Sequence, residues 1–163
     1  YKRQLQCTPA QPGCADCPLA SRCLALAAGT VAERPVKQSK TKVRDRWFNY
    51  LHVTCGDRTL LRRRGEGDIW QGLYEFPMIE TDRAADFSEL TASEEFRTVL
   101  GGVEWRLLRS VAMPKHQLSH QTLHAVFHRI EISFPVDFPS VPTATLGDYA
   151  VPRLIDRYLD RQP

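Results

Sequence analysis

The chain has 163 residues and lacks any apolar run of about eighteen residues, and it carries no segment that resembles a secretory signal peptide. The first absence excludes a helix that crosses a membrane, and the second argues against secretion. A strong charge is lacking as well, because 22 Lys and Arg against 19 Asp and Glu leave a net charge of only +3. A charge of this size does not by itself indicate a polyanionic partner. We therefore expect an intracellular, cytoplasmic monomer without membrane contact.

An even set of cysteines is also lacking, since the sequence has five. Four of them form the pattern C-x6-C-x2-C-x5-C at Cys7, Cys14, Cys17 and Cys23, whereas Cys55 stands alone in a strand-like run. An odd count argues against a disulfide framework and favours a reducing compartment. Four thiolates so close together can surround one metal centre, which is either zinc or an iron–sulfur cluster. Cys55 is expected to be a small, buried apolar residue.

The composition indicates one full domain with a small appendage, because 42% of the residues are hydrophobic. Residues 1–23 hold the cysteine pattern, residues 24–45 form a basic linker, and residues 46–163 form the main domain. The opening residues 1–6 read like the last turn of a helix, so we expect a C-terminal piece of a longer protein. The basic residues between Glu33 and Trp47, which include Lys40, Lys42 and Arg46, are interpreted as a solvated stretch.

The patterns of residues 46–163 predict an α+β sandwich with the order β-β-β-α-β-β-α. A capping box at residues 91–94 is expected to stabilise the first helix, and Pro152 falls in the first turn of the second. The predicted strands are 47–55, 59–64, an irregular 69–79, 103–113 and 122–134, and the predicted helices are 87–100 and 149–160.

Histidines recur every four residues at His116, His120, His124 and His128. On a helix this spacing would suggest a zinc site. The run from 122 to 132 is rich in β-branched and aromatic residues, however, and favours a strand, where residues four apart lie about 13 Å from each other. We therefore expect no shared metal ion, and we single out only His120, which can form a hydrogen-bonding pair with Ser119.

Three segments together resemble the C-terminal half of the adenine DNA glycosylases of the MutY type. The first is the cysteine pattern, which is similar to that family's [4Fe–4S] loop. The second runs from Arg62-Arg63-Arg64 to Trp70-Gln71-Gly72-Leu73-Tyr74-Glu75-Phe76-Pro77, and the third is His116-Gln117-Leu118-Ser119-His120. They occur in the family's order and span nearly the whole chain.

This resemblance implies DNA base-excision repair, in which adenine mispaired with 8-oxoguanine is removed. A helical N-terminal domain of such proteins flips the adenine and cleaves its glycosidic bond. The C-terminal domain has a Nudix-like fold, a mixed β-sheet with flanking helices, and recognises the oxidised guanine. Because the catalytic carboxylates of the family lie upstream of the cysteines, this fragment is not expected to be active alone. Its implied partners are duplex DNA with 8-oxoguanine opposite adenine and its own N-terminal catalytic domain.

The resemblance also assigns roles to residues. Cys7, Cys14, Cys17 and Cys23 would hold the [4Fe–4S] cluster. Leu118, Ser119 and His120 would form the loop that senses the lesion. Sequence-independent phosphate contacts would come from Arg62, Arg63, Arg64, Lys40 and Lys42.

Two alternatives remain. A Nudix hydrolase of oxidised nucleotides needs glutamates in the pattern R-E-U-x-E-E-x-G-U to hold Mg²⁺. When this pattern is aligned on Gly101, Thr98 and Val99 occupy the places of the two metal-binding glutamates. The other alternative is an interaction module with a structural four-thiolate zinc site, although the spacing lacks the two C-x2-C pairs of a zinc ribbon.

Overall fold

The computed structural model describes residues 6–8, 11–34 and 43–161 and divides the chain into two compact units, 1–42 and 43–163. Among its described residues, the first unit has the short helices η2 (Ala20–Arg22), α1 (Leu24–Ala27) and η3 (Val31–Glu33). In the described part of the chain, no helix is both long and apolar enough to cross a membrane.

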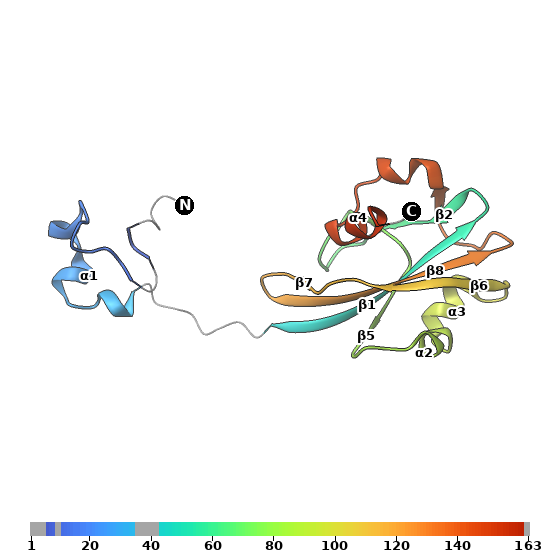
Figure 1. The fold of residues 1–163 in the computed structure, drawn as a ribbon, viewed down its shortest axis with the longest axis horizontal. Coiled ribbons are helices and arrows are strands. Elements are labelled where there is room, and N and C mark those ends of the chain that lie inside the picture. The colour runs from blue at the N-terminus through green and yellow to red at the C-terminus, as the bar shows by residue number, and fades with distance from the viewer. Residues whose placement is uncertain (1–5, 9–10, 35–42, 162–163) are drawn as a thin grey trace. The chain divides into compact units, whose positions relative to one another are not determined.

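The second unit is built around a mixed sheet of seven strands (Figure 1). Its main path is β6-β8-β1-β2-β9, with β5 paired to β1 and β7 paired to β8, and a separate ladder joins β3 to β4. The elements are β1 (Arg44–Cys55), β2 (Arg58–Leu60), β3 (Arg62–Arg63), β4 (Tyr74–Glu75), β5 (Met78–Thr81), α2 (Phe87–Thr91), α3 (Glu94–Leu100), β6 (Trp105–Ala112), β7 (His116–Gln117), β8 (Gln121–Ile132), β9 (Ser140–Pro142), η4 (Thr143–Asp148) and α4 (Arg153–Leu159).

The two long central strands, β1 and β8, run parallel and pair at eleven positions from Arg44↔Gln121 to Thr54↔Glu131. All other pairings are antiparallel. A parallel pair needs a long connection between its strands. Here the connection contains β2 to β7 and both α2 and α3.

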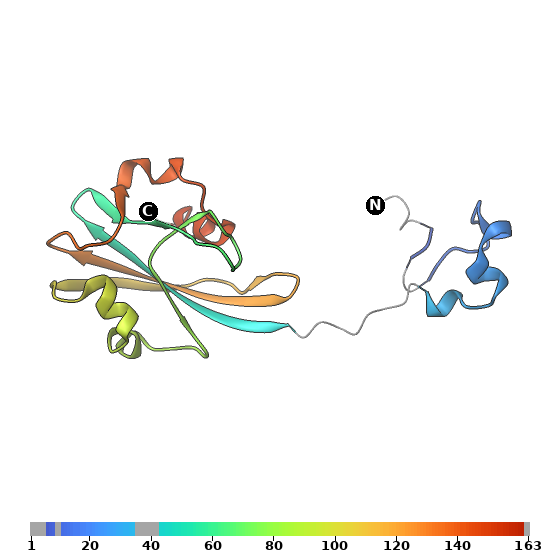
Figure 2. The same ribbon diagram turned by 180° about the vertical axis from the view of Figure 1, so that it is seen from behind.

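Side chains that alternate along β1 supply a separate core to each face of the sheet. Phe48 and Tyr50 pack with the buried residues of α4, which we call the α4-side core. Leu51 and Val53 point to the opposite face and pack with buried residues of α2 and α3, which we call the α3-side core. Figure 2 shows the same layering from behind, with α4 on one side of the sheet and α2 and α3 on the other.

This architecture confirms the predicted α+β sandwich with a mixed sheet and flanking helices. The expected helix 87–100 is instead two helices, because Ser93 caps α3 by accepting the N–H of Phe96 at 3.1 Å. The capping box belongs to Asp86 and Glu89, which begin α2, and so its predicted position at 91–94 was wrong. Pro152 is the N-cap of α4 rather than part of its first turn. Strands β7 and β9, two and three residues long, were not predicted.

The expectation that the histidines lie in strands and a loop is confirmed. His116 is in β7, His124 and His128 are in β8, and His120 lies in the loop between these strands. In the parts of the chain that the structure describes, no group of three or more His, Cys, Asp or Glu side chains is arranged to hold a metal ion. Cys55 is half-buried at the end of β1 and packs against the α3-side core.

Candidate nucleic-acid interface

The four cysteines of the N-terminal unit all line one small hollow, together with Gln6, Gly13, Ala20 and Leu26. A turn in which the N–H of Cys17 bonds to the carbonyl of Cys14 brings these two residues together, and Cys23 is the N-cap of α1. None of the four is in a disulfide. Four free thiols have the chemistry of a sulfur-ligated centre, but among the described residues they are not arranged as a formed metal site.

The hairpin between β7 and β8 presents three residues at its turn, Leu118, Ser119 and His120, which we call the hairpin tip. Its ends are fixed by two backbone hydrogen bonds. The N–H of Leu118 donates to the carbonyl of Gln121 at 2.8 Å, and the N–H of Arg44 donates to the carbonyl of His120 at 3.1 Å. Leu118 is half-buried against the α4-side core, whereas Ser119 and His120 are exposed. The polar residues of the tip are therefore available to a ligand while the leucine anchors it.

Arg46 lies beneath this hairpin and joins four parts of the unit. Its guanidinium donates to both carboxylate oxygens of Asp68 at 2.7 Å, to those of Glu80 at 2.7 and 2.6 Å, and to Oε1 of Gln121 at 3.1 Å. Only 8% of its side chain is exposed. The interpretation of Arg46 as part of a solvated stretch was therefore wrong, because its carboxylate partners lie 22 and 34 residues away and no local pattern reveals them.

The charges of this network shift the pKa values of its members. The two carboxylates raise the pKa of Arg46 above its ordinary value, mainly through their hydrogen bonds. The hydrogen bond from Arg46 lowers the pKa of Asp68 to about 2. Both groups therefore stay ionised at neutral pH, and the network holds β1, β5, the 65–73 loop and the base of the hairpin together.

The arginines of the Arg62-Arg63-Arg64 run have different surroundings. They line a hollow of about 270 Å³ together with Asp68, Glu75 and Met78. Arg64 is only 7% exposed and pairs with Glu75 and Asp68, and Arg62 pairs with Glu75 at 3.3 Å. Arg63 is exposed and donates from Nε to the carbonyl of Gly72 at 2.9 Å. Of the three, Arg63 is thus the most available for a phosphate; Lys40 and Lys42 lie outside the described residues.

Thr98 and Val99, which the alignment on Gly101 puts at the two metal-binding glutamate places of a hydrolase, lie on α3. Thr98 donates its hydroxyl to the carbonyl of Glu94 at 2.9 Å, and Val99 packs partly buried against the α3-side core. A nearby hollow of about 350 Å³ is lined by Glu80 and Glu89, which are paired with arginines, and also by Asp82 and Glu95. Thr98 and Val99 therefore offer no carboxylate to Mg²⁺ at the two aligned positions, although Glu94 and Glu95 begin the same helix.

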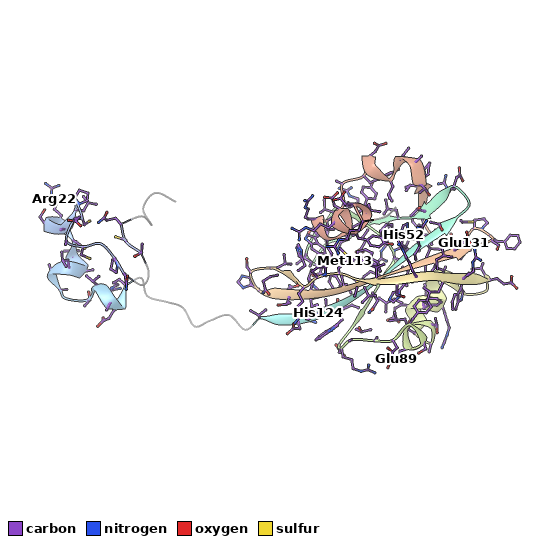
Figure 3. The ribbon with its side chains drawn as sticks, viewed as in Figure 1. Arg22, His52, Glu89, Met113, His124 and Glu131 are labelled. Carbon is purple, nitrogen blue, oxygen red and sulfur yellow. The ribbon has the colours of Figure 1, made fainter. Side chains whose placement is uncertain are left out.

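On the α3 side of the same hairpin, His124 stacks on Trp47 with ring centroids 4.8 Å apart, and its Nε2 lies 2.7 Å from Oδ1 of Asp45. Figure 3 labels His124 near the end of the sheet where β1 begins. His124 is therefore engaged within the sheet surface.

Comparison with known proteins identifies the family and finds solved structures with a similar fold. Residues 49–161 match the model of a family described as the NUDIX domain. Among solved structures, the MutT protein from Methanosarcina mazei Go1 is similar with a TM-score of 0.55 and 15% identity, over 73% of this chain and 93% of that chain. The solution structure of the E. coli ORF135 protein is similar with a TM-score of 0.52 and 15% identity, over 72% of this chain and 91% of that chain.

A curated relative is the adenine DNA glycosylase of Buchnera aphidicola subsp. Schizaphis graminum (strain Sg), which is 24% identical over 143 residues. The similarity covers 82% of this chain but only 36% of the relative. The chain therefore corresponds to about a third of the length of that glycosylase.

Proposed function

The chain belongs to the NUDIX domain family, and we propose that it recognises a base in DNA instead of hydrolysing a nucleotide. The observation that carries the proposal is the hairpin tip, where Leu118 is anchored and Ser119 and His120 are exposed side by side. The similarity to an adenine DNA glycosylase supports a role in DNA repair. Thr98 and Val99, at the places of the two metal-binding glutamates, count against hydrolysis.

The proposed ligand is 8-oxoguanine opposite adenine in duplex DNA. This base differs from guanine at C8, which carries an oxygen acceptor, and at N7, which becomes a donor. The hydroxyl of Ser119 can accept from N7–H or donate to the C8 oxygen, and His120 can contact the adjoining phosphate. Leu118 packs the tip against the core, and this anchoring reduces the conformational entropy that the polar groups lose when they bind the base.

The test is a binding titration at one stated salt concentration, with two duplexes that carry guanine or 8-oxoguanine opposite adenine. We expect the chain to bind the oxidised duplex more tightly, and the double variant S119A/H120A to lose most of this preference. The control is S133A, an exposed serine just beyond the far end of β8, which should keep the preference. Equal preference in the double variant and the unmodified chain would contradict the proposal.

For the intact protein, we propose that the glycosidic bond of the mispaired adenine is cleaved in a part outside these residues. The chain alone should therefore release no adenine from the duplex. The hydrolase alternative has a separate assay, in which Mg²⁺-dependent formation of 8-oxo-dGMP from 8-oxo-dGTP is measured. We expect none, and measurable turnover would favour the alternative.

We further propose that Cys7, Cys14, Cys17 and Cys23 hold a [4Fe–4S] cluster. The support is that all four thiols line one apolar hollow and are free of disulfides. A bound cluster would tie together a segment that has little apolar core of its own. Protein isolated without oxygen should contain iron and acid-labile sulfide in about equal amounts, and C14S/C17S should contain little of either. Zinc without sulfide would favour a structural zinc site.

A further inference from the structure

The loop of residues 65–73 holds Trp70 in an unusual backbone conformation. Its φ of 63° makes it the only non-glycine residue with a positive φ in the described part of the chain. A bulky side chain rarely adopts this conformation, and such residues concentrate at functional sites. The loop is held on both sides of Trp70: the N–H of Ile69 donates to Oδ1 of Asp68 at 2.7 Å, and the N–H of Leu73 donates to the carbonyl of Trp70 at 3.1 Å.

The ring of Trp70 lies beside the hairpin that carries the tip. It meets His116, the first residue of β7, edge to face with centroids 6.0 Å apart, and it meets Phe48 of the core at 6.3 Å. Trp70 packs against the α4-side core and is only half-buried, so part of the residue remains open to solvent. The loop and the hairpin thus present an aromatic surface next to the tip.

Two exposed guanidinium groups lie near this surface. Arg63 bonds to Gly72, two residues beyond Trp70, and the charge of Arg157 of α4 adds to burial in lowering the pKa of His116. Neither arginine forms a salt bridge with any carboxylate of the described residues, in contrast to Arg46, Arg62 and Arg64.

The other two tryptophans have different neighbours. Trp47 is stacked on His124 beside the carboxylate of Asp45. Trp105 lies in a cluster with Phe87 and Phe96 on the α3 side. Trp105 is more exposed, at 39%, but it packs on the α3 side, so Trp70 is the tryptophan of the α4 side whose partly open side chain lies near Arg63.

We propose that Trp70, Arg63 and Arg157 form a nucleotide-binding wall beside the hairpin tip, in which a base stacks on the open indole surface and the guanidinium groups contact adjoining phosphates. This assignment deepens the proposed function and rests on it for DNA as the source of the nucleotide. Stacking tolerates any base, and phosphate contacts carry no sequence information. The wall therefore supplies affinity, whereas Ser119 and His120 supply the preference for the oxidised base.

The contact is tested with single-tryptophan variants of the full chain. W47F/W105F retains only Trp70, and W47F/W70F retains only Trp105, which serves as the matched reporter away from the wall. Each is titrated with the 8-oxoguanine duplex and with free 8-oxo-dGMP, while the anisotropy of a labelled duplex measures DNA binding independently. Circular dichroism confirms that both variants are folded.

We expect the duplex to quench Trp70 fluorescence and to leave Trp105 unchanged. Quenching by free 8-oxo-dGMP alone would support the wall but assign it to free nucleotides, and would contradict the proposed DNA-binding function. Duplex binding by anisotropy without any change at Trp70 would overturn the wall and leave the proposed function standing. No change in either the anisotropy or the Trp70 fluorescence would contradict both the wall and the proposed DNA-binding function.

Substitutions separate stacking from packing. W70F keeps an aromatic face and should bind duplex DNA nearly as well as the unmodified chain, whereas W70L should weaken binding about tenfold for guanine and 8-oxoguanine duplexes alike. R63Q/R157Q should reduce the slope of log K against log salt by about 1.8, the value for two lost phosphate contacts. R153Q, an exposed arginine of α4 that pairs with Asp156, is the control and should keep the slope. A slope unchanged by R63Q/R157Q would overturn the phosphate contacts.

Discussion

At the scale of single residues, two buried histidines make the stability of the main unit dependent on pH. His52 is 5% exposed, stacks on Phe76 and has Nδ1 2.9 Å from the hydroxyl of Tyr158. Burial, aided by the charges of Arg129 and Arg109, lowers the pKa of His52 to about 4. Burial also lowers the pKa of His128 to about 4. Figure 3 labels His52 in the main unit.

Because the pKa of these histidines is lower in the folded than in the unfolded state, the unfolded chain takes up protons first as the pH falls. The free energy of unfolding should therefore be highest above pH 6.5 and decline down to about pH 4. For His52 the lowered pKa corresponds to roughly 3 kcal/mol. Urea denaturation at several pH values checks this, with H52Q as the comparison because glutamine does not titrate. An identical pH slope in H52Q and the unmodified chain would refute the role of His52.

The Arg46 network gives a second prediction at this scale. R46M leaves Asp68 and Glu80 without their main partner, so we expect a loss of about 3 kcal/mol in the free energy of unfolding. R46K should recover only part of it, because an ammonium cannot bond to both carboxylates in the same forked geometry. The exposed pair Arg153–Asp156 is the control, and R153Q should cost less than about 1 kcal/mol. Urea midpoints of the three variants provide the measurement.

At the scale of elements, the end of α3 depends on a glycine for steric reasons. A Cβ at Gly101 would lie 2.2 Å from the carbonyl oxygen of Arg97, which also accepts the N–H of Gly101. G101A should therefore disturb the last turn of α3 and lower the free energy of unfolding by about 2–3 kcal/mol. At Gly147, nothing lies within 4 Å of an added Cβ, and G147A should be neutral or slightly stabilising. Similar thermal midpoints for the two variants would rule out this explanation.

The elements also show how far the sequence could predict the fold. Alternation in the central strands and the apolar face of the final helix were sufficient for the α+β class. The split between α2 and α3 was missed because Ser93 can continue a helix or begin one, and the choice depends on its contacts. The parallel pairing of β1 with β8 is invisible to local patterns, since registers such as Phe48↔Ala125 join residues far apart in the chain.

For the candidate site, the motif around Ser119 and His120 was visible in the sequence because it is continuous. Trp70 was noted there only as part of a matching segment. Its significance depends on a backbone angle and on Arg157, which belongs to a distant helix. Arg46 was misjudged for the same reason, since a basic residue in a basic stretch becomes buried only when distant carboxylates meet it. A site whose residues lie far apart in the sequence cannot be predicted from local patterns, and its recognition requires the structure.

At the scale of the whole molecule, the two compact units are expected to respond differently to loss of the cysteines. All three tryptophans belong to the unit of residues 43–163, so tryptophan fluorescence reports on that unit alone. C14S/C17S should lose its bound iron and yet keep the thermal midpoint seen by fluorescence within about 2 °C. A midpoint that falls together with the iron content would show that the main unit depends on the cysteine unit for its stability.

The path of the chain into the main unit has a mechanical consequence. The chain enters at Val43 and continues directly into β1, whose parallel ladder with β8 has eleven evenly spaced pairs. Tension that arrives along β1 therefore loads the whole ladder in shear, and the force is shared instead of peeling one bond after another. The first bond on this path joins Arg44 to His120 of the hairpin tip. Force on the incoming chain and force from a ligand bound at the hairpin tip therefore both act on the hydrogen bond between Arg44 and His120.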